Sequence, residues 1–67
     1  MADTPTAIRE AMSSSGVTQI ALAERLGLTQ PAVSARLAGR TPITVDELRT
    51  IAAFLNVPVA DLVTDAA

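Results

Sequence analysis

The fold is determined mainly by residues 19–38, QIALAERLGLTQPAVSARLA. The first part of this segment predicts a helix over residues 19–26, because the apolar Leu22, Ala23 and Leu26 recur at the i, i+1 and i+4 spacing of one helix face. Ala23 is small enough to let another helix cross closely at that point. This helix is therefore expected to pack tightly against the segment that follows it.

A tight corner and a second helix are predicted next. Gly27 follows the last apolar residue, where glycine adopts the left-handed conformation that other residues resist. Thr29 is suited to cap a helix, since its hydroxyl accepts a bond from a free backbone N–H one turn in. Pro31 falls in the first turn, where its missing N–H costs nothing, and Val33 and Leu37 recur at i, i+4 as the buried side. The two helices form a predicted helix-turn-helix.

The flanking segments predict three further short helices. One begins near Thr4 and ends at the serine cluster of residues 13–15. Another begins at Thr44, which forms a capping-box pattern with Glu47 three residues later. The last follows Pro58. Because no segment has the period-2 alternation of a strand, the fold class is predicted to be all-α, with five short helices.

A chain of 67 residues has room for one domain with a small core. We expect a single helix-turn-helix domain over residues 1–67, with a core from about 5 to 64 and loose tails at 1–4 and 65–67. Apolar residues make up 49% of the chain and aromatic residues only 1%, so the core must be aliphatic.

Catalysis is not expected. The chain contains no cysteine and no histidine, so the usual general bases, nucleophiles and metal ligands are missing. Asp46 and Glu47 are adjacent at a helix start, where their side chains diverge and favour the positive end of the helix. The sequence therefore predicts neither an enzyme nor a bound metal, cofactor or small-molecule ligand.

The composition also indicates the cellular compartment of the protein. No apolar run approaches the roughly 18 residues of a membrane span, and MADTPTAIRE lacks the basic start and apolar block of a signal peptide. The absence of cysteine is compatible with a reducing cytoplasm. We therefore expect a soluble, cytoplasmic protein with no membrane partner.

Charge is unevenly distributed along the chain. The net charge is −2 and the isoelectric point is about 4.7, which argues mildly against nucleic-acid binding. Residues 19–40 nevertheless contain three arginines against one glutamate, a net charge of +2, whereas the remainder of the chain carries −4. Association with DNA depends on the field at the docking face more than on the total charge.

Seven residues carry a family resemblance through their identities and spacing: Gln19, Leu22, Ala23, Leu26, Gly27, Leu28 and Val33. Together with the later segment ELRTIAAFLNVPVADLV, they resemble the Cro/CI-type (Xre-like, lambda-repressor-like) helix-turn-helix family of bacterial and phage regulators. The resemblance covers roughly Ile8 to Val63. It implies a five-helix DNA-binding domain.

One position departs from the family pattern. The family usually has an apolar residue three positions after Val33, where this chain has Arg36, and the apolar Leu37 comes one position later. Either the second helix is rotated slightly about its axis, or Leu37 alone fills the gap and Arg36 lies along the edge.

The resemblance implies that the second helix enters the major groove of DNA with its N-terminal end. Gln30 opens that helix and is the best base-reading candidate, because its amide can both donate to and accept from an adenine edge. Ser34, one turn later, could bond a base or a phosphate. Pro31 and Ala35 could offer apolar contact to a thymine methyl group, for example.

Phosphates are expected where backbone N–H groups and the positive helix end meet the DNA. The resemblance implies such a contact for Gln19, and the arginines that flank the second helix are natural phosphate partners. The predicted phosphate contacts are Thr18, Gln19, Thr29, Arg36, Arg40 and Thr41.

Apolar residues off the core stripes indicate a partner. Phe54 occupies a position that the helical pattern would leave polar, and Val59 and Val63 could join it in one patch. The alternatives are a slightly irregular core and a homodimer interface near the C-terminus, as many Cro-like proteins use. A dimer would place two recognition helices about one turn of DNA apart, matching a palindromic operator.

The sequence thus predicts a sequence-specific DNA-binding transcriptional regulator that is associated with the nucleoid and represses, as a homodimer, by occupying a double-stranded operator. The alternative is a protein-interaction module, antitoxin-like or the partner of an anti-repressor, that keeps the scaffold without binding DNA. The acidic balance and the absence of lysine favour this alternative. An intramolecular pair at Arg36, together with an acidic or covered face, would strengthen it.

Overall fold

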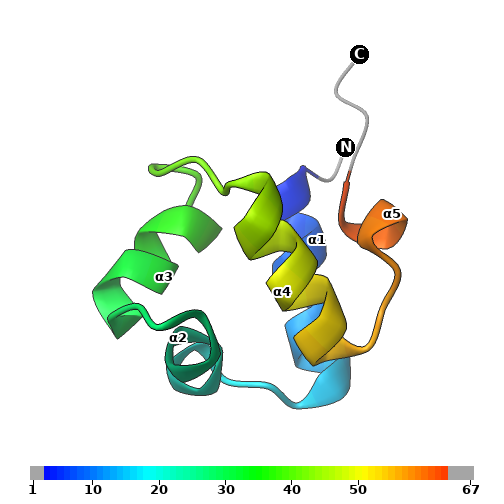
Figure 1. Ribbon diagram of the computed structural model, residues 1–67, viewed down its shortest axis with the longest axis horizontal. Helices are drawn as coiled ribbons and strands as arrows, with labels where there is room; N and C mark the ends of the chain where they lie inside the picture. Colours follow the sequence, from blue (N-terminus) through cyan, green and yellow to red (C-terminus); the bar gives the residue numbers. More distant parts are fainter. Residues whose placement is uncertain (1–2, 64–67) are drawn as a thin grey trace.

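The computed structural model describes residues 3–63, which form five helices and no strand. The all-α prediction is therefore confirmed. No helix in this range is both long and apolar enough to cross a membrane. In chain order the helices are α1 (Thr4–Ser15), α2 (Gln19–Leu26), α3 (Gln30–Leu37), α4 (Val45–Leu55) and α5 (Val59–Leu62) (Figure 1).

Helices α2, α3 and α4 each begin at a threonine whose hydroxyl accepts a backbone hydrogen bond. Thr18 Oγ1 and Thr29 Oγ1 accept from the N–H groups three residues later, at 3.1 and 3.2 Å. The predicted capping box of α4 is present: Thr44 Oγ1 accepts from Glu47 N and Glu47 Oε1 accepts from Thr44 N, both at 3.1 Å. Because such bonds span three residues, the local sequence is sufficient to specify these helix starts.

The start of α1 corrects the predicted N-terminal tail of residues 1–4. Asp3 caps α1 and Thr4 is its first residue. Asp3 Oδ1 accepts a hydrogen bond from Thr6 N at 2.9 Å, and this bond holds the pKa of the Asp3 carboxyl below its ordinary value. The other residues of the predicted tails, together with position 64, lie outside the described residues.

The corner between α2 and α3 depends on Gly27. Its φ of +69° lies in the left-handed region, where a side chain would be strained. This conformation lets Gly27 N donate to Glu24 O at 3.3 Å and Leu28 N donate to Ala23 O at 2.9 Å. Two carbonyls in the last turn of α2 are thereby satisfied, and Leu28 turns back to pack against the core.

The core is formed where α4 meets the other helices. Helix α4 packs on α1, α2 and α5, while α3 packs on α1 and α2. Figure 1 shows α4 in the middle of the molecule and α3 at one side, so that α3 has an outward face. No polar or charged side chain of residues 3–63 is fully buried. The buried side chains are Ile8, Met12, Leu22, Ala23, Val33, Leu37, Ile51, Ala52, Leu55 and Leu62.

The unusual order of Arg36 and Leu37 is accommodated at the edge of α3. Leu37 is only 3% exposed and belongs to the core, whereas Arg36 is half-buried. Leu37 therefore fills the apolar position, and Arg36 lies along the edge.

Candidate nucleic-acid interface

The helix-turn-helix brings the two predicted DNA-contacting glutamines together. Gln30 Nε2 donates to Gln19 Oε1 at 2.8 Å, linking the first turn of α3 to the first turn of α2. Gln30 is exposed and Gln19 is half-buried. The bond uses one N–H of the Gln30 amide, so the second N–H and the carbonyl oxygen keep the capacity to bond an outside group. The sequence identified both residues but not the bond between them.

The other predicted base contacts lie along α3 in the expected order. Pro31 is exposed in the first turn, and Ser34 and Ala35 are half-buried. Ser34 is four residues after Gln30, so the two polar side chains lie one helical turn apart on neighbouring positions of one face. This face offers an amide and a hydroxyl for hydrogen bonding, with a small apolar side chain beside them.

The capping threonines keep a hydrogen for an outside acceptor. Thr18 Oγ1 and Thr29 Oγ1 each accept from a backbone N–H, which leaves the hydroxyl proton able to donate. Both residues are exposed. Each stands at the N-terminal end of a helix of eight residues, where the remaining backbone N–H groups and the helix dipole favour an anion.

Arg36 forms an intramolecular pair, the feature that would strengthen the protein-interaction alternative. Its Nε lies 3.1 Å from Glu47 Oε1 in an ion pair, and its Nη1 donates to Ala32 O, also at 3.1 Å. The Arg36 and Glu47 side chains are 18% and 19% exposed. The guanidinium thus bridges α3 and the start of α4, so a phosphate contact by Arg36 would compete with these bonds.

One carboxylate oxygen of Glu47 accepts two hydrogen bonds, one from α3 and one from the N-cap of its own helix. Oε1 accepts both from Arg36 Nε and from Thr44 N, the second being half of the capping box. The Arg36 hydrogen bond, helped by the bond from Thr44, holds the pKa of Glu47 below its ordinary value of 4.5, although partial burial opposes the shift. The charged form of Glu47 is therefore the one that stabilises the fold.

We expect the free energy of unfolding to fall as the pH drops below about 4.5, the ordinary pKa of Glu47. Because the folded-state pKa is the lower one, the stabilisation is complete above the unfolded-state pKa and is lost as the pH falls through the folded-state pKa. The loss should be about 1 kcal/mol, since water screens a part-buried pair. Urea unfolding from neutral pH to about pH 3 measures it.

The matched pair of variants for this experiment is Glu47→Gln and Asp46→Asn. Both remove one carboxylate from the first turn of α4, but Asp46 is exposed. The Glu47 variant should lose this part of the pH dependence and the Asp46 variant should retain it. Equal pH profiles for the two variants would contradict a stabilising role for the ion pair.

The loop after α3 carries the remaining predicted phosphate contacts. Arg40 is exposed and Thr41 is half-buried. The backbone N–H groups of both residues donate to Ala35 O, at 2.9 and 3.3 Å, so the loop folds back on the end of α3. Arg40 therefore lies close to the C-terminal end of α3 and is exposed to solvent.

Arg9 makes structural hydrogen bonds that the sequence analysis did not predict. Its Nη1 donates to Leu37 O, and its Nη2 donates to Thr6 Oγ1 at 3.0 Å. A cation at the C-terminal end of α3 meets the negative end of the helix dipole. The pairing with Thr6 follows helical spacing and could have been predicted, whereas the bond to a backbone carbonyl 28 residues away could not.

The predicted dimer residues do not share one environment. Val59 and Val63 are 37% and 53% exposed. Phe54 is half-buried and packs against the core, and the Arg25 guanidinium carbon lies 5.9 Å from the centre of its ring. The two valines are thus the part of the predicted patch that faces solvent, while Phe54 also contributes to the contact between α2 and α4.

Comparison with known proteins agrees with this architecture. A family model described as helix-turn-helix matches residues 8–62, from within α1 to the end of α5. No curated protein and no solved structure matches the chain significantly. The matched residues include both helix N-termini, the Gln19–Gln30 bond and the Arg36–Glu47 pair.

Proposed function

The chain belongs to the Cro/CI-type helix-turn-helix family, a family of DNA-binding regulators, and from this membership we propose that it recognises a specific operator and represses transcription there. The observation that carries the proposal is the bond between Gln19 and Gln30. It holds an exposed amide at the N-terminal end of α3, the end that enters the major groove in helix-turn-helix proteins.

Base recognition would then rest on α3. Gln30 is positioned to pair with an adenine edge, because its remaining N–H and its carbonyl oxygen match the N7 and N6 groups of that base. Ser34 adds a hydroxyl one turn later, and Pro31 and Ala35 add apolar contact to thymine methyl groups. Since this surface offers few hydrogen bonds, part of the specificity is expected to come from the shape of the DNA.

Backbone contacts would fix the register of α3 in the groove. The N-terminal ends of α2 and α3, with Thr18, Gln19 and Thr29, are suited to one side of the groove. Arg40 and Thr41 are suited to the other side, because they follow the C-terminal end of α3. Arg36 could contact a phosphate only if its guanidinium first released the Glu47 carboxylate.

We infer that the active form is a homodimer. A single domain of this size would contact one half-site, and two copies related by a two-fold axis would read a palindrome. The exposed Val59 and Val63 support an interface near α5. Repression would follow from occupancy of the operator, which excludes the polymerase.

The experiment that tests the proposal is selection of bound duplexes from a random DNA pool, followed by titration of the best sequence at several salt concentrations. A palindromic consensus with an affinity that falls as salt rises supports a dimeric operator binder. Failure to enrich any sequence at low salt would contradict the DNA proposal.

Arg40→Ala is expected to weaken binding to all sequences about equally and to reduce the salt slope by about one unit per half-site. The reason is that a phosphate contact releases counterions but carries no base information. The matched control is Arg49→Ala, which removes an exposed arginine of α4 outside the proposed contacts. If both variants change the slope equally, Arg40 acts only through total charge.

A second candidate function is favoured by the Arg36–Glu47 pair. This pair neutralises one of the three arginines of residues 19–40 in a protein of net charge −2 without lysine. A protein-interaction module on the same scaffold would not need that cation. Against it, Gln30 and Pro31 are exposed, so the face is not covered. A protein partner becomes the better proposal if the selection enriches no DNA sequence.

A further inference from the structure

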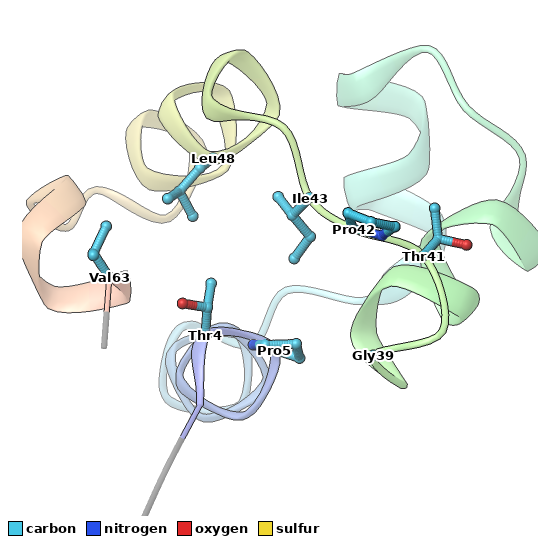
Figure 2. Close-up of a pocket in the computed structure, with 8 residues that line it drawn as sticks. All are labelled: Thr4, Pro5, Gly39, Thr41, Pro42, Ile43, Leu48 and Val63. Atoms are coloured by element: carbon cyan, nitrogen blue, oxygen red, sulfur yellow. The ribbon is translucent and has the colours of Figure 1, made fainter. Parts of the chain in front are cut away.

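The loop that joins α3 to α4, residues 38–44, is open on one side. Figure 2 shows a hollow between this loop and the first turn of α1, with the Ile43, Leu48 and Val63 side chains around it. Its volume is about 260 Å³. The residues that line it are Thr4, Pro5, Gly39, Thr41, Pro42, Ile43, Leu48 and Val63. Side-chain packing against α1 therefore supports the loop incompletely on this side.

Two sets of polar contacts hold the two ends of the loop. At its start, Arg40 N and Thr41 N donate to Ala35 O. At its end, Glu47 Oε1 accepts from Thr44 N at 3.1 Å and pairs with Arg36 Nε at the same distance. The ion pair thus spans the loop and ties the start of α4 directly to α3.

Arg36 is itself fixed at the α3 end of this connection. Its Nη1 donates to Ala32 O one turn earlier on the same helix, at 3.1 Å. The guanidinium is therefore held in one orientation by α3 while its Nε engages Glu47. Because the side chains are less than one-fifth exposed, water competes for these bonds less than it would at an open surface.

A phosphate contact by Arg36 would conflict with this arrangement. The phosphate would approach a guanidinium that already pairs with the Glu47 carboxylate at 3.1 Å, and two anions at short range repel each other. The pair has no net charge, so it adds little to the attraction of DNA. Arg36 is better placed to arrange its neighbours than to bind the nucleic acid.

We propose that Arg36 is a positioning residue: its ion pair with Glu47 sets the α3–α4 loop against the recognition helix, so that Arg40 and Thr41 reach the DNA backbone in register with α3. The role of the loop toward DNA rests on the proposed function. The restraint that the ion pair places on the loop is independent of the proposed function, because it is a property of the protein without DNA. The two parts can therefore be tested separately.

The first test uses the free protein and the double variant Arg36→Met with Glu47→Gln. It keeps the net charge and the approximate side-chain length, and the amide oxygen of the introduced glutamine can still accept from Thr44 N. We expect amide hydrogen exchange at Arg40 and Thr41 to become about tenfold faster, relative to core amides such as that of Leu55, because the loop opens locally. Equal acceleration of loop and core amides, or none, would overturn the restraint.

The second test measures DNA affinity of the same variant on the selected duplex as a function of salt. We expect affinity to fall about threefold to tenfold on all sequences and the salt slope to fall no further than it does in Arg40→Ala, since only the contacts made by the loop lose their register. If the double variant reduces the slope by a further unit per half-site in a protein that already carries Arg40→Ala, Arg36 itself contacts a phosphate and the proposal is overturned.

The single variant Glu47→Gln distinguishes the two roles of Arg36 by the direction in which the DNA affinity changes. Compared with Asp46→Asn, which removes the same charge from the same turn of α4, a positioning role predicts weaker DNA binding by Glu47→Gln, because the ion pair is lost. A phosphate-binding Arg36 predicts tighter binding, because a competing carboxylate is removed. If no duplex is enriched at all, the DNA proposal fails, and the exchange measurement on the free protein still decides whether the pair restrains the loop.

Discussion

Leu22→Ala is expected to leave most of the protein unfolded at room temperature. Leu22 is 0% exposed and lies on α2, which packs on both α3 and α4. Truncating a fully buried leucine costs about 2–5 kcal/mol, because burial is lost and a cavity remains. A single core in a chain of 67 residues supplies only about 3–5 kcal/mol of net stability. The two quantities are similar, so little folded protein should remain.

Far-UV circular dichroism during urea unfolding measures this effect. The matched control is Ile20→Ala, two residues earlier on the same helix, where the side chain is 64% exposed. The control should shift the stability by about 0.5 kcal/mol or less, since most of that side chain already faces water. Equal unfolding midpoints for the two variants would contradict the assignment of Leu22 to the core.

Gln30→Ala is expected to produce the largest change in DNA recognition. A bidentate contact to one base contributes about 1–3 kcal/mol of discrimination, equivalent to about fivefold to 150-fold in affinity. The loss should appear at a single base position of each half-site. The same substitution removes the partner of Gln19, so the phosphate contact expected at the start of α2 should also weaken.

Repeating the duplex selection with the Gln30→Ala protein measures the change. A base position that is strongly preferred by the wild type should become degenerate, while the other positions stay recognisable. Arg40→Ala serves as the comparison, because a backbone contact should weaken binding without changing the consensus. An unchanged consensus with a uniform loss of affinity would place Gln30 among the backbone contacts.

Several elements of this fold could be predicted because their causes are local. The α2 helix, its end at Gly27 and the capping box of Thr44 and Glu47 each depend on groups within a few residues. The same rules apply to Asp3, which caps α1 through Thr6 N three residues on, although Asp3 falls within the predicted tail.

The candidate interface was predicted residue by residue but not as an arrangement. The positions of Gln30, Ser34 and Arg40 relative to α3 follow from the sequence, and an outward face agrees with the exposure of Gln30 and Arg40 and with the partial exposure of Ser34. The bond that holds Gln30 against Gln19 connects two helices across the turn, and its geometry depends on the angle between them.

The helices, their caps and the apolar stripes that form the core are already specified by the amino-acid sequence, because each follows from spacing along one segment. The partners of the polar side chains are specified only by the tertiary fold. In the folded domain Arg36 pairs with Glu47, Arg9 donates to the carbonyl of Leu37, and Gln30 donates to Gln19. A guanidinium can serve a carboxylate, a carbonyl or a phosphate equally well by its chemistry. Which of these it meets is set by the packing of helices that are distant in sequence.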